Sequence, residues 1–209
     1  MRLGFLASHR GSNMQAVIDA CSEGRLRAVP AVVISNNRNA EAIARARTRQ
    51  IPTAVLNSVT HPISEELDLA ILEALERQHC DLIVLAGFMK KIGPHVLDVF
   101  AGRILNVHPA LLPKFGGQGM FGSHVHKAVL AAKEKATGVS VHLVDAEYDH
   151  GRVLAQEQVA VMDDDSVESL SARVLQKEHE VLVRTLERIL SGEIVLSEKM
   201  PERRKIALI

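Results

Sequence analysis

Two polar side chains at the end of an apolar run, Asn106 and His108, have the chemistry to catalyse a group transfer. The run Ile104–Val107 reads as a buried strand that His108 follows directly, and residues two apart on a strand share a face. In open α/β sheets, ligands bind at the carboxyl ends of the strands. An asparagine there can stabilise an oxyanion, and a histidine can exchange a proton near neutral pH. A lone histidine is more often structural, but this pair, followed by the rigid turn Pro109–Pro113, favours catalysis.

Four acidic residues stand where they could serve a site. Asp145, Glu147 and Asp149 lie between two predicted strands, and a carboxylate near His108 would favour the imidazolium and raise its pKa. The sequence does not say which of the three faces the histidine, and a solvated turn is the alternative. Glu178 falls on the inward stripe of a predicted helix, where an acid more often meets a ligand or a buried partner than solvent.

No nucleophile elbow is present, so direct transfer between bound substrates is expected.

The first predicted strand ends in another polar segment, residues 8–13, directly before a helix. A glycine-containing turn there exposes backbone N–H groups and the positive end of the helix dipole, which favours a phosphate. The spaced glycines of a dinucleotide site and the lysine of a triphosphate loop are missing, so a single phosphate group is expected. An ordinary helix cap by Ser12 or Asn13 is an equally good interpretation of this segment alone.

Composition limits the class of protein. The 209 residues suffice for one α/β domain, with 47% hydrophobic residues, 24% charged residues and zero net charge. Neutrality, the absence of Trp and the single tyrosine, Tyr148, argue against a nucleic-acid or membrane surface. Isolated Cys21 and Cys80, and an apolar N-terminus too short for a signal peptide, predict a cytoplasmic protein with reduced thiols.

Short apolar runs alternate with amphipathic stretches, which is typical of a parallel sheet covered by helices. Strands are predicted at residues 3–7, 31–35, 53–56, 82–86, 104–107, 138–144 and 153–161. Helices are predicted at 14–24, 39–49 and 65–78, and a short helix is predicted around Val125 and Val129. A long helix is predicted to begin within residues 165–168 and to end near residues 191–192. At its start, a side-chain cap is followed by an acid that can reach back to it, Glu168. We expect a single-domain α/β fold with an open, twisted, mostly parallel sheet, helices on both faces and a Rossmann-like N-terminal half.

These segments resemble the folate-dependent formyltransferases, and within them the glycinamide ribonucleotide formyltransferases, over nearly the whole chain. The resemblance is carried by residues 11–13, 85–89, 106–113 and 138–142, and by Asp149, Glu178 and His179. It implies the formyltransferase fold and transfer of the formyl group of 10-formyltetrahydrofolate, a co-substrate, to the amine of glycinamide ribonucleotide in purine biosynthesis. No metal is implied.

The resemblance also implies a role for each matching residue. Asn106 would stabilise the tetrahedral oxyanion, protonated His108 would assist there or pass a proton to the folate nitrogen, and Asp149 would keep His108 charged. The ribonucleotide would be held by Gly11, Ser12, Asn13, Gly87, Pro109 and Glu178. The folate site would comprise Leu85, Met89, Lys90, Lys91, Ile92, Asn106, Val144, Asp145, Ala146, Glu147, Tyr148 and Asp149.

These roles divide the single domain, residues 1–209, into a phosphate- and nucleotide-binding half (1–108), a folate-binding and catalytic half (109–195) and a polar tail (196–209). The chain departs from the family at His9-Arg10, where Arg10 adds charge, and at Ser64, where some relatives place an arginine for the glutamate tail of the folate. The segment 114–126 is longer and richer in glycine, and we expect a flexible flap with Met120 and Phe121 over the substrate. Its His124-x-His126 pair lacks a convincing third metal ligand.

Three alternatives remain. Methionyl-tRNA formyltransferase shares the central motif but normally adds a C-terminal nucleic-acid-binding domain, and formyltetrahydrofolate deformylase normally carries an extra N-terminal domain; neither extension is expected here. A non-catalytic nucleotide-binding module would not need Asn106, His108 and Asp149 together. The expected partners are the two small-molecule substrates, without nucleic acid or membrane, in a monomer or weak homodimer.

Overall fold

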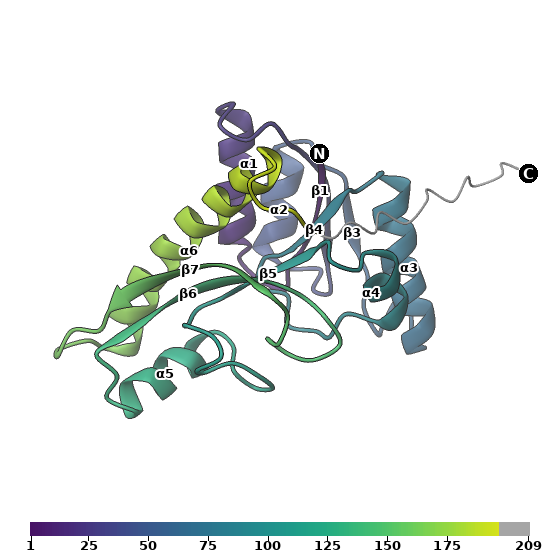
Figure 1. Cartoon of the computed structure of the whole chain (residues 1–209). Helices are drawn as coiled ribbons and strands as arrows, with labels where there is room; N and C mark the ends of the chain where they lie inside the picture. Colours follow the sequence, from purple (N-terminus) through teal and green to yellow (C-terminus); the bar gives the residue numbers. More distant parts are fainter. Residues whose placement is uncertain (197–209) are drawn as a thin grey trace, which may run out of the picture.

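A seven-stranded sheet runs through the molecule in the order β3-β2-β1-β4-β5-β6-β7 (Figure 1). In the computed structural model, which describes residues 1–196, β1 to β5 are parallel and β6 and β7 join antiparallel at one edge. The strands are β1 Arg2–Leu6, β2 Val29–Ser35, β3 Thr53–Val55, β4 Leu82–Leu85, β5 Ile104–His108, β6 Ala136–Leu143 and β7 Val153–Ala160. This confirms the predicted α/β fold. The tail predicted at 196–209 lies, beyond Leu196, outside the described residues.

The central strands are apolar along their length because helices cover both faces of the sheet. Leu3 and Phe5 of β1 pack into one core, while Leu6 packs into the other. The first core is completed by α1 (Ser12–Ser22), α2 (Glu41–Thr48), α5 (Ser123–Ala131) and α6 (Val167–Leu190), and the second by α3 (Ser64–Arg77) and α4 (Pro94–Val99). Within residues 1–196, no helix is long and apolar enough to cross a membrane.

The chain reverses its course across the sheet at β1 and β4. From β1 it winds outward through β2 and β3, and it then returns to β4 on the other side of β1. At such a switch point the loops leaving the two strands diverge and open a crevice. Ser8 ties the two loops together at its base, since its N–H donates to the carbonyl of Gly87 at 3.1 Å and its Oγ accepts from the N–H of Met89 at 2.8 Å. The fold thus creates a ligand site at this edge.

The one helix that the sequence pattern did not predict is α4. It has six residues, and its cap comes from α3: Asp68 accepts hydrogen bonds from the backbone N–H groups of His95 at 2.7 Å and Val96 at 3.3 Å. A cap supplied by a residue 27 positions earlier leaves no local signal.

Helix α6 is capped by Ser166, inside the predicted start, but the residue that reaches back is a different one. Ser169, and not Glu168, accepts from the N–H of Ser166 at 2.9 Å and donates its own N–H to Ser166 at 3.2 Å. A capping box needs its partner three positions after the cap, and Glu168 stands only two positions after it.

Asp68→Ala should destabilise the protein by about 1–2 kcal/mol, because it removes the cap of α4 and leaves one buried and one partly buried N–H group without an acceptor. Urea unfolding followed by circular dichroism measures the change. Asp98→Ala, at an exposed position of the same helix, is the matched control and should change the unfolding free energy by less than about 0.5 kcal/mol. Equal unfolding free energies for the two variants would contradict the capping role.

Candidate active site

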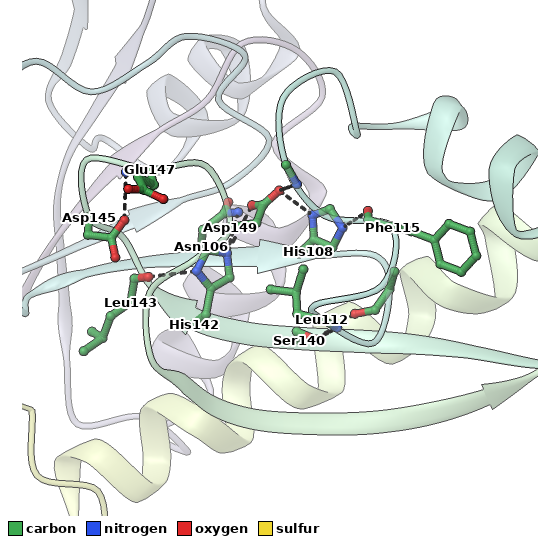
Figure 2. Close-up of polar contacts among 12 residues, drawn as sticks. Asn106, His108, Leu112, Phe115, Ser140, His142, Leu143, Asp145, Glu147 and Asp149 are labelled. Atoms are coloured by element: carbon green, nitrogen blue, oxygen red, sulfur yellow. Dashed lines mark hydrogen bonds and ion pairs between the residues drawn. The ribbon is translucent and has the colours of Figure 1, made fainter.

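Asn106 and His108 lie at the end of β5, and Asp149 reaches them from the loop between β6 and β7 (Figure 2). His108 Nδ1 is 3.5 Å from Asp149 Oδ2, with side chains 3% and 11% exposed. The other two acids of this loop have partners elsewhere: Asp145 accepts from the N–H of Glu147 at 2.9 Å, and the exposed Glu147 pairs with a neighbouring histidine. Of the three candidate acids, the structure therefore places Asp149 against His108.

His142, on β6, completes this cluster and was not among the predicted site residues. It pairs with Asn106 across β5 and β6 and is 2% exposed. Its Nδ1 donates to the carbonyl of Leu143 at 2.8 Å, and its Nε2 lies 3.1 Å from the amide nitrogen of Asn106 and 3.4 Å from Asp149 Oδ1. An amide nitrogen carries two hydrogens. His142 thus orients Asn106 and leaves one N–H for a substrate.

Burial opposes charge on both His108 and Asp149, with different outcomes. Burial raises the pKa of Asp149, but contacts with His142, with His108 and with the N–H of Gly117 outweigh it and hold the pKa below its ordinary value. Burial lowers the pKa of His108, and Asp149 and the carbonyl of Phe115 recover only part of the shift. The expectation that Asp149 keeps His108 protonated is therefore wrong for the free protein. Near pH 7 the histidine is neutral and the aspartate ionised.

The neutral ring of His108 carries its hydrogen on Nε2. That nitrogen lies 2.7 Å from the carbonyl oxygen of Phe115, which can only accept (Figure 2). Nδ1 is then an acceptor on the side of Asp149. A proton taken up on Nδ1 would be stabilised by the carboxylate 3.5 Å away. The pair can therefore hold a proton transiently.

The backbone around Asp149 is tightly closed. Its φ of +59° is in the left-handed region, which aspartate adopts more readily than most residues. Two positions later, a side chain at Gly151 would overlap the carbonyl oxygen of Leu143. Asp149 Oδ2 also accepts from the N–H of Gly117 at 2.9 Å. These constraints fix the direction of the carboxylate.

The turn after β1 presents an open helix N-terminus. Gly11 has a φ of +64°, and a Cβ there would lie 2.7 Å from the Cβ of Ala42, so glycine lets this turn pack on α2. Within the described part of the chain no side chain caps α1, and the interpretation of Ser12 or Asn13 as an ordinary cap is therefore wrong. The N–H groups of the first turn are available to an anion.

Asn13 instead reaches across to α6. Its Nδ2 donates to Glu178 Oε2 at 2.6 Å, and Glu178 is 9% exposed. Burial raises the pKa of Glu178 to about 7, although the hydrogen bond from Asn13 lowers it in part. The acid on the inward stripe of α6 therefore has a buried partner beside the open helix end.

A cavity of about 600 Å³ connects these groups. Its wall comprises residues 9–13, 86–90, 106–109, 117–122, 126, 148, 149, 171, 175 and 178. The predicted catalytic residues line it, as do all the residues predicted for the ribonucleotide: Gly11, Ser12, Asn13, Gly87, Pro109 and Glu178. Met89, Lys90 and Tyr148 of the predicted folate set line it as well.

The remaining predicted folate residues do not line this cavity: Leu85, Lys91, Ile92, Val144, Asp145, Ala146 and Glu147. Leu85 and Ile92 are buried in the core under α3 and α4, and Val144 packs against that core. Ser64, where some relatives carry arginine, is the first residue of α3 and also stands away from the cavity wall.

The glycine-rich segment predicted to cover the substrate forms one wall, which includes Met120 and Phe121. Phe121 is 49% exposed, and its ring lies 5.2 Å from that of His124. His126, by contrast, is buried on α5. Across residues 1–196 no three His, Cys, Asp or Glu side chains gather as metal ligands would.

Residues 1–186 match the family described as formyl transferase. The phosphoribosylglycinamide formyltransferase of Haemophilus influenzae is 35% identical over 95% of this chain and 92% of that protein. The chloroplastic enzyme of that name from Arabidopsis thaliana is 36% identical over 88% of this chain, but this chain spans only 64% of its length. Glycinamide ribonucleotide transformylase 1 from Symbiobacterium toebii has a similar structure, with a TM-score of 0.88 and 34% identity, covering 95% of this chain and 91% of that one. The chain therefore belongs to the formyl transferase family, alongside the phosphoribosylglycinamide formyltransferases.

Proposed function

We propose that the protein transfers the formyl group of 10-formyltetrahydrofolate to the amine of glycinamide ribonucleotide, as a step of purine biosynthesis. The observation that carries this proposal is a single cavity with three kinds of wall: an open helix N-terminus, a buried Glu178 and the Asn106–His108–Asp149 cluster. A phosphate, a ribose and an amine are the ligand groups that suit these walls. Glycinamide ribonucleotide has all three.

At the ribonucleotide end, the phosphate binds the N–H groups of Gly11, Ser12 and Asn13. Arg10 lines the same part of the cavity and adds a positive charge. Glu178 accepts a hydrogen bond from a ribose hydroxyl, while Gly87 and Pro109 border the path to the amine.

The folate enters from the side of Met89, Lys90 and Tyr148. Since Leu85, Ile92 and Val144 turn their side chains into the core, the residues around them contact the folate mainly through backbone groups. On this view residues 1–108 supply most of the ribonucleotide site, and residues 109–195 supply the loop with Asp149 and the glycine-rich wall.

The amine nitrogen attacks the formyl carbon, and the free N–H of Asn106 stabilises the oxyanion that forms. Neutral His108 accepts the proton that the amine loses, and Asp149 stabilises the resulting imidazolium. When the bond between the formyl carbon and the folate nitrogen breaks, the proton passes to that nitrogen. One proton thus moves from amine to folate, and His108 returns to its starting state.

The test of this proposal is a reaction of the purified protein with glycinamide ribonucleotide and 10-formyltetrahydrofolate. We expect formylated ribonucleotide and tetrahydrofolate in equal amounts. Formate without formylated ribonucleotide would indicate a deformylase instead, and the absence of both products would leave only a binding module.

Asn106→Ala should reduce kcat about 100- to 1000-fold, the usual effect of losing one oxyanion donor. Steady-state kinetics with both substrates measures this, and circular dichroism verifies that the variant is folded. Asn39→Ala, at an exposed position, serves as the control and should be unchanged. A folded Asn106→Ala variant with near-normal kcat would refute the role of this residue.

Asp149→Asn should lower the pKa of His108 still further, because the carboxylate makes the largest contribution that raises it. NMR titration of the imidazole measures the shift, and kcat should fall about 100-fold or more as the imidazolium loses its partner. Asp164→Asn, outside the cavity, should leave the titration unaltered. If His108 titrates identically in the Asp149 variant, the proton relay is wrong.

Glu178→Gln should weaken ribonucleotide binding and remove a pH dependence of stability. The folded protein keeps Glu178 protonated up to about pH 7, while the ordinary pKa is 4.5, so the wild type loses stability as the pH rises between these values. At about 1.4 kcal/mol per pKa unit, the gain of the variant over the wild type should approach about 3 kcal/mol at pH 8 and be small near pH 4.5. Urea unfolding at both pH values measures it, with the exposed Glu180→Gln as control. A gain that does not grow with pH would contradict the buried, protonated acid.

A further inference from the structure

His126 is a buried, titratable side chain that the proposed reaction does not use. It lies on α5, at the end of the glycine-rich segment 114–126, and is 3% exposed. It lines the same cavity as His108 and Glu178. Its Nδ1 is sealed from solvent and, within residues 1–196, has no hydrogen-bond partner. Nε2 is the ring nitrogen left to serve the cavity.

This histidine weakens the fold at its own position. A buried polar atom without a partner costs stability and needs a physical reason. The adjacent buried positions of α5 are apolar, Val125 and Val129, both fully buried. A leucine at position 126 would suit this environment without an unsatisfied nitrogen. A ligand that binds the other ring nitrogen would supply the reason for a histidine.

The neutral ring offers the cavity a hydrogen-bond donor. Burial lowers the pKa of His126, and the charge of a protonated His108 lowers it further, so the ring is neutral and carries one hydrogen. In folded proteins a buried N–H without an acceptor is rarer than an acceptor without a donor. Since Nδ1 has no partner, the hydrogen belongs on Nε2.

His126 lines the cavity together with residues from both ends of the proposed ribonucleotide site. Ser171, Leu175 and Glu178 follow i, i+4, i+7 spacing along α6 and all line the cavity, so one face of α6 runs along it from the ribose end. Helix α5 packs against α6, and His126 is near enough to His108 to respond to its charge. The part of the acceptor that links ribose to amine is an amide, whose carbonyl oxygen needs a donor.

We propose that Nε2–H of His126 donates a hydrogen bond to the amide carbonyl of the bound ribonucleotide and so places its amine for attack. This inference rests on the proposed function. It adds a substrate-binding residue that lies outside the Asn106–His108–Asp149 cluster, on α5.

The test is His126→Leu, which fills the site and removes the donor. We expect a higher urea midpoint, because the unsatisfied nitrogen is gone, together with a loss of about tenfold in kcat/KM for the ribonucleotide, the usual effect of one hydrogen bond. KM for the folate should not change. Thr137→Val is the matched control, since Thr137 Oγ1 is also buried without a partner but stands away from the cavity. It should raise the urea midpoint and leave the kinetics unaltered.

A second pair of variants tests the position of the donor even if leucine disturbs folding. The amide nitrogen of glutamine can occupy the place of Nε2, whereas that of asparagine corresponds to Nδ1. The kcat/KM of His126→Gln should therefore be at least about threefold higher than that of His126→Asn. This ratio corresponds to a fraction of the free energy of one hydrogen bond. Equal values for the two, or a stable His126→Leu variant with wild-type kcat/KM, would overturn this inference alone. A wild-type protein that does not formylate the ribonucleotide would overturn the proposed function first.

Discussion

The contact of one buried carboxylate with two histidines is the interaction on which the site depends. Asp149 lies 3.5 Å from His108 and 3.4 Å from His142, and these contacts, together with a backbone N–H, hold its pKa below the ordinary value despite burial. The contacts come from different segments: β5 supplies His108, β6 supplies His142, and the glycine-rich segment supplies the N–H of Gly117. An unpaired buried charge would be costly. The charge on Asp149 therefore holds these segments in register.

Burial favours the neutral form of two other titratable groups of the cavity, His108 and Glu178. It lowers the pKa of His108 and raises that of Glu178 to about 7, so both are pushed toward their neutral forms. Neutral His108 can accept a proton, and protonated Glu178 can donate as well as accept a hydrogen bond. An anionic ligand is instead attracted by the open N-terminus of α1 and by the adjacent Arg10, which both line the cavity. Charge within the site is thus divided between a phosphate end and a proton-transfer end.

Local patterns were sufficient to predict the sheet and one part of the site. Parallel strands covered on both faces are continuous apolar runs, and the spacing of Asn106 and His108 on β5 places them on one face. What could not be predicted depends on contacts distant in sequence. Helix α4 owes its cap to Asp68, and His142 became a site residue through the pairing of β6 with β5. The pKa of His108 was expected to rise, but the depth of burial that lowers it is a tertiary property.

The glycine-rich segment can vary because the catalytic groups use only its backbone. His108 donates to the carbonyl of Phe115, and Asp149 accepts from the N–H of Gly117, so both contacts lie at the start of the segment and require no particular side chain. The residues that follow are free to shape the cavity, as Met120 and Phe121 do. A longer segment can thus alter the wall that faces the substrate without moving the proton-transfer groups. Because the proton-transfer groups contact only the start of the segment, His126 on α5 can approach the substrate without contacting Asp149.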